Sequence, residues 1–289
     1  MPQPESAKST PPVVKKRITD PRSVQVFLVG FTYLFFIGFI FLPLGLVFSQ
    51  AFQKGWSFYL ESIREPYAIE AVKLTLLTVA IVVPVNAVFG VAAAWAITKF
   101  NFKGKSALKS LLDLPFAVSP VIAGLIFVLL VGSRTTFGSW LGEHGIKIIF
   151  STPGIIIATI FVTFPFIARE LIPLMEAQGR DEEEAALTLG AKGWQIFGKI
   201  TLPNIRWGLI YGMILCGARS IGEFGAVSVV SGHIRGQTNT IPLHVEILYS
   251  EYNFTASFAV ASLLVFLALL TVVIKGGIEK QFQKKSFHL

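Results

Sequence analysis

Residues 72–97 read VKLTLLTVAIVVPVNAVFGVAAAWAI, and no charged side chain occurs after Lys73 in this stretch. A helix of roughly 20 apolar residues crosses the roughly 30 Å hydrocarbon core of a bilayer, so the stretch predicts a transmembrane helix. Within lipid, only helices and closed barrels satisfy all their backbone polar groups, and the period-two alternation of barrel strands is missing here. Five further segments have a similar length and composition: Val24–Phe48, Leu111–Val131, Gly154–Ile172, Trp207–Val230 and Ala256–Lys275. The sequence therefore predicts an all-α polytopic membrane protein with six transmembrane helices.

The overall composition supports a membrane environment. The chain has 289 residues, of which 53% are hydrophobic and 15% are charged. Soluble domains carry about 25% charged residues, so this chain is depleted in charge. A net charge of +8 is compatible with nucleic-acid binding when taken alone, but the positions of the basic residues explain it differently. The lipid bilayer is the predicted partner, and nucleic acid is not.

The connections on one side of the predicted spans contain many more lysine and arginine residues than those on the other side. The N-terminal tail, the second and fourth connections and the C-terminus together hold 18 of them, and the other three connections hold six. By the positive-inside rule this bias places both termini in the cytoplasm. Residues 1–22 contain five prolines among polar residues and are predicted to be a disordered cytoplasmic tail. The first apolar segment is longer than a signal-peptide core, which predicts an uncleaved span within a single domain over residues 23–289.

The connection between the fourth and fifth spans, from about Arg169 to Arg206, is the one long predicted cytoplasmic loop. Its central part is expected to form a short helix, with Asp181 as N-cap and Glu184 at the third helical position in a capping box. Gly190 is expected to end this helix in the left-handed conformation. A second short helix is expected to follow and to end at Pro203. A helix of about eight residues is marginal alone, so the loop is expected to need a partner surface.

Ala185, Ala186 and Leu189 are predicted to form a small apolar face on the first short helix. Small residues allow close approach, so this face could seat in a groove on a partner protein. The alternative is that the face packs against the ends of the protein's own helices and that Glu184 serves only as a cap. The spacing within this short helix does not decide between these two interpretations.

A longer pattern does favour the partner groove. The loop fits E-A-A-x₃-G-x₉-I-x-L-P without a mismatch, and it resembles the cytoplasmic loop by which permease subunits of bacterial ATP-binding-cassette importers dock on their ATPase. The resemblance implies a type I importer permease fold and a coupling loop over about residues 178–204. It implies an ATPase-coupling role for seven residues: Glu184, Ala185, Ala186, Gly190, Ile200, Leu202 and Pro203.

ATP is not expected to bind to this chain. Residues 193–199 fit the G-x₄-G-K part of a phosphate-binding loop, but Ile200 occupies the Ser/Thr position that would hold magnesium. Bulky Trp194, Ile196 and Phe197 also lie where such a loop needs an exposed backbone. The chain is therefore predicted to be a transport subunit without a cofactor or ATPase motif, with ATP bound by a separate subunit. The four histidines are dispersed, and no metal site is predicted.

The fifth predicted span contains Arg219, Ser220 and Glu223. Charged residues within a membrane usually face a cavity and pair, and Arg219 and Glu223 share one face of a helix at i and i+4. They are candidates for a gate or a polar lining of the translocation path; a buried structural pair or a hydrated pair near the interface are the alternatives. The small residues Gly208, Gly212, Cys216 and Ser220 repeat every four positions and are expected to serve helix packing.

Residues 218–232, ARSIGEFGAVSVVSG, and the segments that follow to Tyr252 are similar to the sulfate and molybdate permeases of this importer family. The resemblance implies a multi-pass protein of the bacterial inner membrane that moves sulfate or thiosulfate by alternating access. It also implies three kinds of partner: two copies of an ATPase, a second permease subunit and a periplasmic sulfate-binding protein. A molybdate or tungstate permease that pairs with itself is the nearest alternative. A secondary transporter driven by an ion gradient is the alternative from another class.

Overall fold

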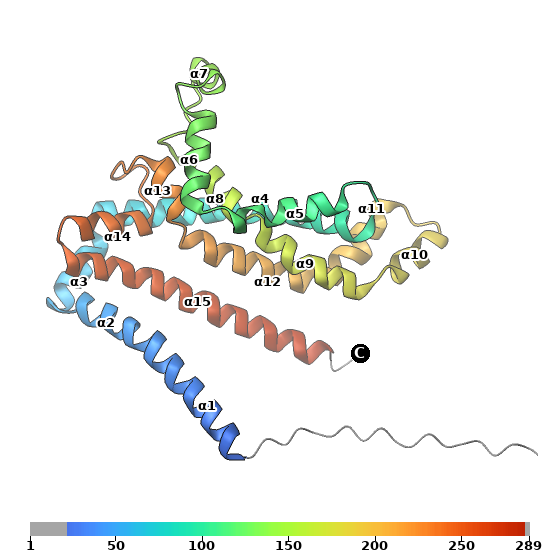
Figure 1. Cartoon of the computed structure of the whole chain (residues 1–289), viewed down its shortest axis with the longest axis horizontal. Helices are drawn as coiled ribbons and strands as arrows, with labels where there is room; N and C mark the ends of the chain where they lie inside the picture. The colour runs from blue at the N-terminus through green and yellow to red at the C-terminus, as the bar shows by residue number, and fades with distance from the viewer. Residues whose placement is uncertain (1–21, 287–289) are drawn as a thin grey trace, which may run out of the picture. The chain divides into compact units, whose positions relative to one another are not determined.

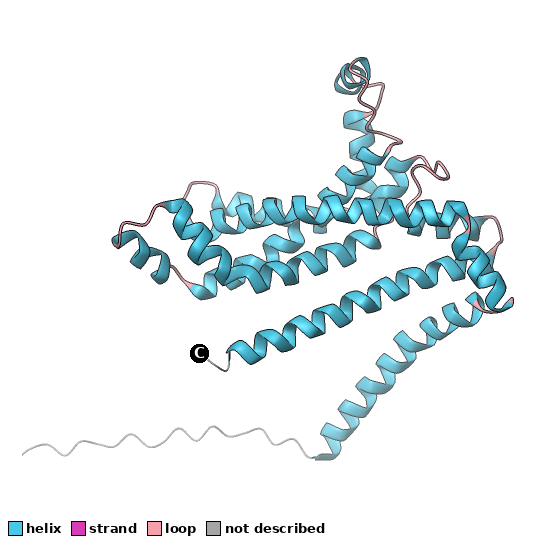
Figure 2. Ribbon diagram, turned by 180° about the vertical axis from the view of Figure 1, so that it is seen from behind, coloured by secondary structure: helices cyan, strands magenta, loops and turns pink. Residues whose placement is uncertain are grey.

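A computed structural model describes the backbone of residues 22–286 and the side chains of residues 22–277. The described part is built from helices without a strand (Figures 1 and 2), which confirms the predicted all-α class. The predicted disordered tail, residues 1–22, lies outside the described residues except for Arg22. The helices are α1 (Arg22–Phe36), η1 (Ile37–Phe41), α2 (Leu42–Ala51), α3 (Gly55–Arg64), α4 (Pro66–Lys99), α5 (Lys105–Ala117), α6 (Pro120–Val131), α7 (Thr136–Glu143), α8 (Thr152–Thr163), α9 (Pro165–Gln178), α10 (Asp181–Thr188), α11 (Gly193–Ile196), η2 (Phe197–Thr201), α12 (Leu202–Ile221), α13 (Gly225–Ser231), α14 (Ile241–Ser250) and α15 (Phe254–Ser286), where η marks a π-helical turn.

The chain divides into two units, Met1–Leu46 and Val47–Leu289. The described part of the first unit consists of α1, η1 and the first half of α2, and α1 and η1 contain no buried residue. The second unit holds every other helix together with the buried core. The functional residues predicted from sequence all lie in the second unit.

Among the described residues, four helical segments are long and apolar enough to span a membrane: Arg22–Ala51, Pro66–Lys99, Thr152–Gln178 and Phe254–Gly277. Two bent helix pairs, α5 with α6 and α12 with α13, bring the total to six if each pair is one span. The third and fifth predicted spans therefore correspond to bent pairs of helices. The axes of α5 and α6 differ by 105°, and those of the Gly193–Ile221 segment and α13 differ by 53°.

The break between α5 and α6 has a local cause. Proline disfavours the helical conformation of the residue before it, and Ser119, which precedes Pro120, has φ −58° and ψ 134°. Pro120 then starts α6 at a position where its missing N–H costs nothing. Figure 1 shows that α6 consequently leaves the line of α5 and carries α7 away from the long helices of the second unit.

The largest helix contact of the second unit joins α4, α9 and α12 around Ile167, which is fully buried. A side-chain carbon placed on Gly90 of α4 would lie 2.8 Å from Cβ of Ile167, and one on Gly212 of α12 would lie 3.2 Å from its Cα. Gly90 therefore allows α4 and α9 to meet this closely, and a side chain at Gly212 would be tightly crowded. Gly208 also abuts Leu174 of α9. These contacts confirm the packing role expected for the small residues on α12, in agreement with membrane helix association through small residues.

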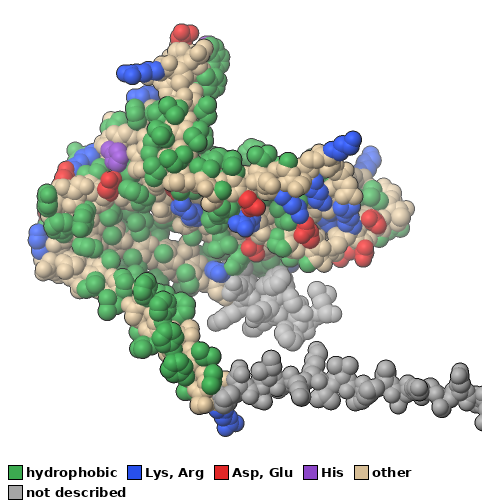
Figure 3. Space-filling model, viewed as in Figure 1, with side chains coloured by type: hydrophobic (Ala, Val, Ile, Leu, Met, Phe, Trp, Pro, Cys, Tyr) green, Lys and Arg blue, Asp and Glu red, His purple; other side chains and the backbone are tan. Residues whose placement is uncertain are grey.

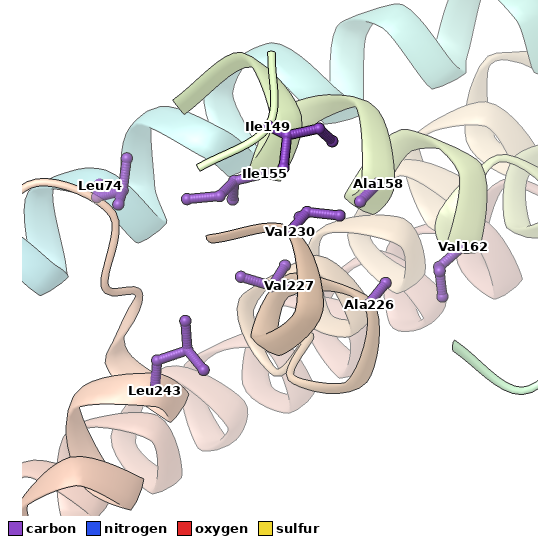
Figure 4. Close-up of a cluster of buried hydrophobic side chains, with 9 residues drawn as sticks. All are labelled: Leu74, Ile149, Ile155, Ala158, Val162, Ala226, Val227, Val230 and Leu243. Atoms are coloured by element: carbon purple, nitrogen blue, oxygen red, sulfur yellow. The ribbon is translucent and has the colours of Figure 1, made fainter. Parts of the chain in front are cut away.

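A second core cluster surrounds α13 (Figure 4). Ala226, Val227 and Val230 of α13 pack against buried side chains from α4, α8, α14 and the loop that precedes α8. The short helix after the bend in the fifth span is thus held by apolar contacts on several sides. Buried polar contacts also join the spans elsewhere; for example, Asn86 Nδ2 on α4 donates to Thr163 Oγ1 of α8 at 2.9 Å.

Candidate functional site

The predicted coupling loop forms two helices at one end of the second unit. The first is α10, Asp181–Thr188, which carries four acidic residues in its first turn. Negative charge there is favourable because it faces the positive end of the helix dipole. Figure 3 shows acidic and basic side chains gathered at this end of the unit, around α9, α10 and α11.

The predicted capping box at the start of α10 is wrong. Asp181 is the first helical residue, and Arg180 occupies the N-cap position with φ −128° and no capping hydrogen bond from its side chain. Glu184 N donates to Arg180 O at 2.9 Å, so the helix starts one residue earlier than a cap at Asp181 allows. The four consecutive acidic residues made the start of this helix ambiguous by one position in the sequence.

The end of α10 agrees with prediction. Gly190 has φ +83°, in the left-handed region that favours glycine. Gly190 N donates to Leu187 O at 2.9 Å, and Ala191 N donates to Ala186 O at 3.0 Å, which closes the helix as a Schellman-type turn does. No atom lies within 4 Å of a side-chain carbon placed on Gly190, so backbone conformation and not crowding requires this glycine.

Large apolar side chains near the end of α10 and at the start of α11 are exposed. Helix α10 has no buried residue, and Leu187 and Leu189 are 57% and 88% exposed. Trp194, at the second position of α11, is 84% exposed. The described residues therefore leave these side chains uncovered. On the predicted face itself, Ala185 and Leu189 are exposed and Ala186 is half-buried, which disfavours the alternative in which this face packs against the protein's own helix ends.

Three acidic side chains of α10 have different surroundings. Glu182 Oε2 accepts from Asn204 Nδ2 at 2.6 Å, and Glu183 accepts from Thr201 Oγ1 at 2.7 Å and pairs with Lys99 Nζ at 3.0 Å. Glu184 is exposed, and within the described part of the chain it makes no hydrogen bond or ion pair through its side chain. The contacts of Glu183 were not predicted, because its partners come from distant parts of the sequence and no spacing signals them.

The second part of the loop departs from the prediction in one respect. Helix α11 continues through η2 directly into α12, so the expected second short helix is the start of the fifth span. Pro203 does not end a helix but occupies the first turn of α12. Ile200 is half-buried, and Leu202 and Pro203 are exposed. Residues 193–199, which partly fit a phosphate-binding loop, are helical.

Arg219 and Glu223 form the predicted ion pair, although not on one helix. Helix α12 ends at Ile221, and Glu223 lies in the short link to α13. Arg219 Nη1 lies 2.6 Å from Glu223 Oε2, and the other carboxylate oxygen accepts from Ala226 N of α13 at 2.8 Å. The Glu223 side chain is 1% exposed and that of Arg219 is 33% exposed. Glu223 thus joins the two halves of the bent span, while Arg219 reaches the surface.

Ser220, the third candidate for the translocation path, is buried, and its hydroxyl donates to Cys216 O at 2.7 Å. This intrahelical bond occupies its donor within α12. Within the described part of the chain, Arg219 and Glu223 pair with each other, whereas the Ser220 side chain makes no hydrogen bond with either.

A buried histidine lies in the connection between the fifth and sixth spans. His244, on α14, is 1% exposed. Burial lowers its pKa below the usual 6.5, nearby Arg235 acts in the same direction, and Glu251 opposes them. Arg235 also donates to Glu251, and this hydrogen bond lowers the pKa of that carboxyl group. Burial therefore disfavours the protonated form of His244 relative to an exposed imidazole.

Comparison with known proteins identifies the family. Residues 86–283 match the sequence profile described as binding-protein-dependent transport system inner membrane component. The chain belongs to this family. The matched range contains the whole coupling loop, the Arg219–Glu223 pair and Lys99, so each of these features lies in the part of this inner membrane component that the family profile covers.

Two groups of relatives are similar over nearly the whole chain. The sulfate transport system permease protein CysW of Escherichia coli K12 is 48% identical over 91% of this chain and 92% of its own length. CysW of Synechococcus elongatus is 49% identical over 90% and 91% of the two chains. The sulfate transport system permease protein CysT of Escherichia coli K12 is 35% identical over 89% and 93%.

The fold is also seen in a solved transporter. A crystal structure of a bacterial alginate ABC transporter, in complex with an alginate pentasaccharide-bound periplasmic protein, superimposes with a TM-score of 0.75 at 18% identity. The match covers 91% of this chain and 96% of the other. At this identity the likeness establishes the fold of an importer permease and carries no information on the solute.

Proposed function

We propose that this inner membrane component is a permease subunit of an ATP-driven importer that moves sulfate or thiosulfate. The observation that carries the proposal is the 48% identity with CysW over 91% of the chain, against 35% with CysT. The alternative of a secondary transporter driven by an ion gradient is not favoured, because the family depends on a binding protein. Molybdate remains the oxyanion to compare with sulfate in the assay below.

The complex we propose contains a CysT-like second permease, two copies of a CysA-like ATPase and a periplasmic sulfate-binding protein. Both termini and the α10 end lie in the cytoplasm, as the distribution of lysine and arginine supports. The exposed residues Leu187, Leu189 and Trp194 support a docking role for the loop, because they offer an uncovered apolar surface to the ATPase. Glu184, Ala185, Ala186, Gly190, Ile200, Leu202 and Pro203 are the proposed coupling residues.

Transport proceeds by alternating access in this proposal. ATP binding brings the two ATPase subunits together and moves α10, and the spans then open a cavity to the binding protein. Arg219 and Glu223 lie along the path, with Ser220 beside them. Glu223 neutralises Arg219, so the path holds no unpaired cation at this pair that would trap a dianion. Selection of the oxyanion then rests with the binding protein, since burying sulfate without matched donors is very costly.

Uptake by the reconstituted complex tests this proposal. The chain is purified with its second permease and ATPase and reconstituted in proteoliposomes together with the binding protein. Uptake of radiolabelled sulfate is then measured with and without ATP. Sulfate accumulation that needs ATP, and that thiosulfate reduces more strongly than molybdate, is the expected result. Accumulation driven by a proton gradient without ATP, or competition by molybdate alone, contradicts the proposal.

A further inference from the structure

The coupling helix α10 is held to the rest of the chain in an unusual way. It contains no buried residue, so apolar packing does not anchor it. A helix of eight residues is also unstable alone. Force applied to α10 can reach the spans only through the chain on either side or through contacts of its polar side chains.

One polar cluster supplies such a connection to α4, from which α10 is separated by some 80 residues of chain. It consists of Thr98, Lys99, Gly179, Arg180, Glu183 and Thr201. Lys99 Nζ donates to Gly179 O at 2.6 Å and pairs with Glu183 Oε2 at 3.0 Å. In return, Arg180 Nη2 donates to Thr98 O at 2.8 Å. Thr98 and Lys99 end α4, where unpaired carbonyl groups favour a cationic partner.

The same carboxylate reaches a second span. Glu183 uses one oxygen for Lys99 and the other for the hydroxyl of Thr201, which immediately precedes α12. Thr201 is buried, and the side chains of Lys99 and Glu183 are only 9% and 15% exposed. A charge pair this poorly exposed is screened little by solvent, and removing one partner leaves the other charge uncompensated.

We infer that Lys99, Glu183 and Thr201 form the link that transmits movement of α10 to α4 and α12. This inference rests on the proposed coupling role of the loop and adds residues outside the E-A-A…G…I-x-L-P pattern that pointed to it. Glu183 positions α10 on the spans, whereas Glu184 stays exposed toward the ATPase. The link makes α10, the end of α4 and the start of α12 move together during the transport cycle.

A double-mutant cycle tests the link in the complete reconstituted complex. Lys99→Met and Glu183→Gln each remove one charge; glutamine keeps the side-chain length of glutamate, and methionine keeps most of the unbranched lysine stem. The double variant removes both charges. The cycle Lys109→Met and Glu176→Gln is the control, because that pair has the same 3.0 Å separation but is 44% and 50% exposed. Each variant is measured for abundance, co-purification of the ATPase, binding-protein-stimulated ATPase activity and sulfate imported per ATP hydrolysed.

Either single change in the link is expected to lower sulfate imported per ATP on the order of tenfold while the ATPase still co-purifies. The double variant is expected to lose no more than the worse single variant, because both act on one interaction. The control cycle stays within about twofold of the parent chain. If the Lys99→Met variant does not accumulate in the membrane, the sulfate imported per ATP by the isosteric Glu183→Gln variant tests the inference by itself.

Parental import ratios in the single variants, or losses that multiply in the double variant, overturn the inference. If the parent complex hydrolyses ATP but imports no sulfate, that result contradicts the proposed function and not the inference about the link. In that case the stimulated ATPase activities of the variants still report on the link.

Discussion

Replacing Gly190 with valine isolates the contribution of one backbone conformation to coupling. Gly190 has φ +83°, and a side-chain carbon added at this position would meet no atom within 4 Å, so the substitution costs backbone strain and no packing. Left-handed backbone costs an L-residue about 1–2 kcal/mol, and a β-branched side chain raises this cost. Each 1.4 kcal/mol lowers the population of the native turn about tenfold. Because α10 has no buried residue to offset the strain, the turn is expected to rearrange.

The assay is ATP-dependent sulfate uptake, normalised to the amount of permease in the membrane. Gly190→Val is expected to lower uptake at least about tenfold, with unchanged abundance because the rest of the fold does not contact this position. Gly190→Asn is the matched control, since asparagine tolerates the left-handed region best after glycine, and it should retain most of the uptake. Parental uptake by Gly190→Val, or equal loss in both variants, refutes the assigned role of the turn.

Three further predictions concern the spans and the α14 connection. Gly90→Val should reduce the amount of folded protein in the membrane, because the valine side chain collides with Ile167. The control Gly142→Val, whose side chain lies in open space on α7, should leave this amount unchanged; fluorescence-detected size-exclusion chromatography measures both. Arg219→Ala leaves the buried carboxylate of Glu223 unpaired at a cost of about 3–5 kcal/mol, so its apparent Tm should fall sharply, and adding Glu223→Gln should recover much of the loss. The pKa of His244 is lower in the folded chain than in the unfolded chain, so the unfolded chain binds more protons and thermal stability should decline as pH falls below about 6.5. His244→Gln should weaken this decline, and a pH profile of thermal stability that the substitution leaves unchanged would contradict the prediction.

The sequence predicted most of the features that depend on local or periodic signals. Apolar length gave the positions of the spans, and the spacing of Gly190 after a short acidic segment predicted a left-handed helix end that the backbone adopts. The i, i+4 spacing of Arg219 and Glu223 predicted their ion pair. The bend before Pro120 was not among the predictions, although proline disfavours the helical conformation of the residue that precedes it.

Features that depend on tertiary contacts were missed. Nothing near Glu183 in the sequence indicates that its carboxylate meets Lys99 and Thr201, because the three residues come together only when α4, α10 and α12 assemble. The N-terminal boundary of α10 was also missed, since four adjacent acidic residues fit two helix registers equally well. Likewise, the role of Glu223 in joining α12 to α13 follows from the break at Gly222, which apolar length does not reveal.

Docking of α10 on a nucleotide-hydrolysing subunit is tested most directly by cross-linking within the assembled complex. A photoreactive amino acid is placed at Leu189, which is 88% exposed on the turn after α10, and in a control at Phe137 of α7, which is 57% exposed. A cross-link from position 189 to the ATPase that changes in yield between the ATP-free and ATP-bound states, with none from position 137, is the predicted result. An assembled, transporting complex in which position 189 never reaches the ATPase would contradict coupling through this helix.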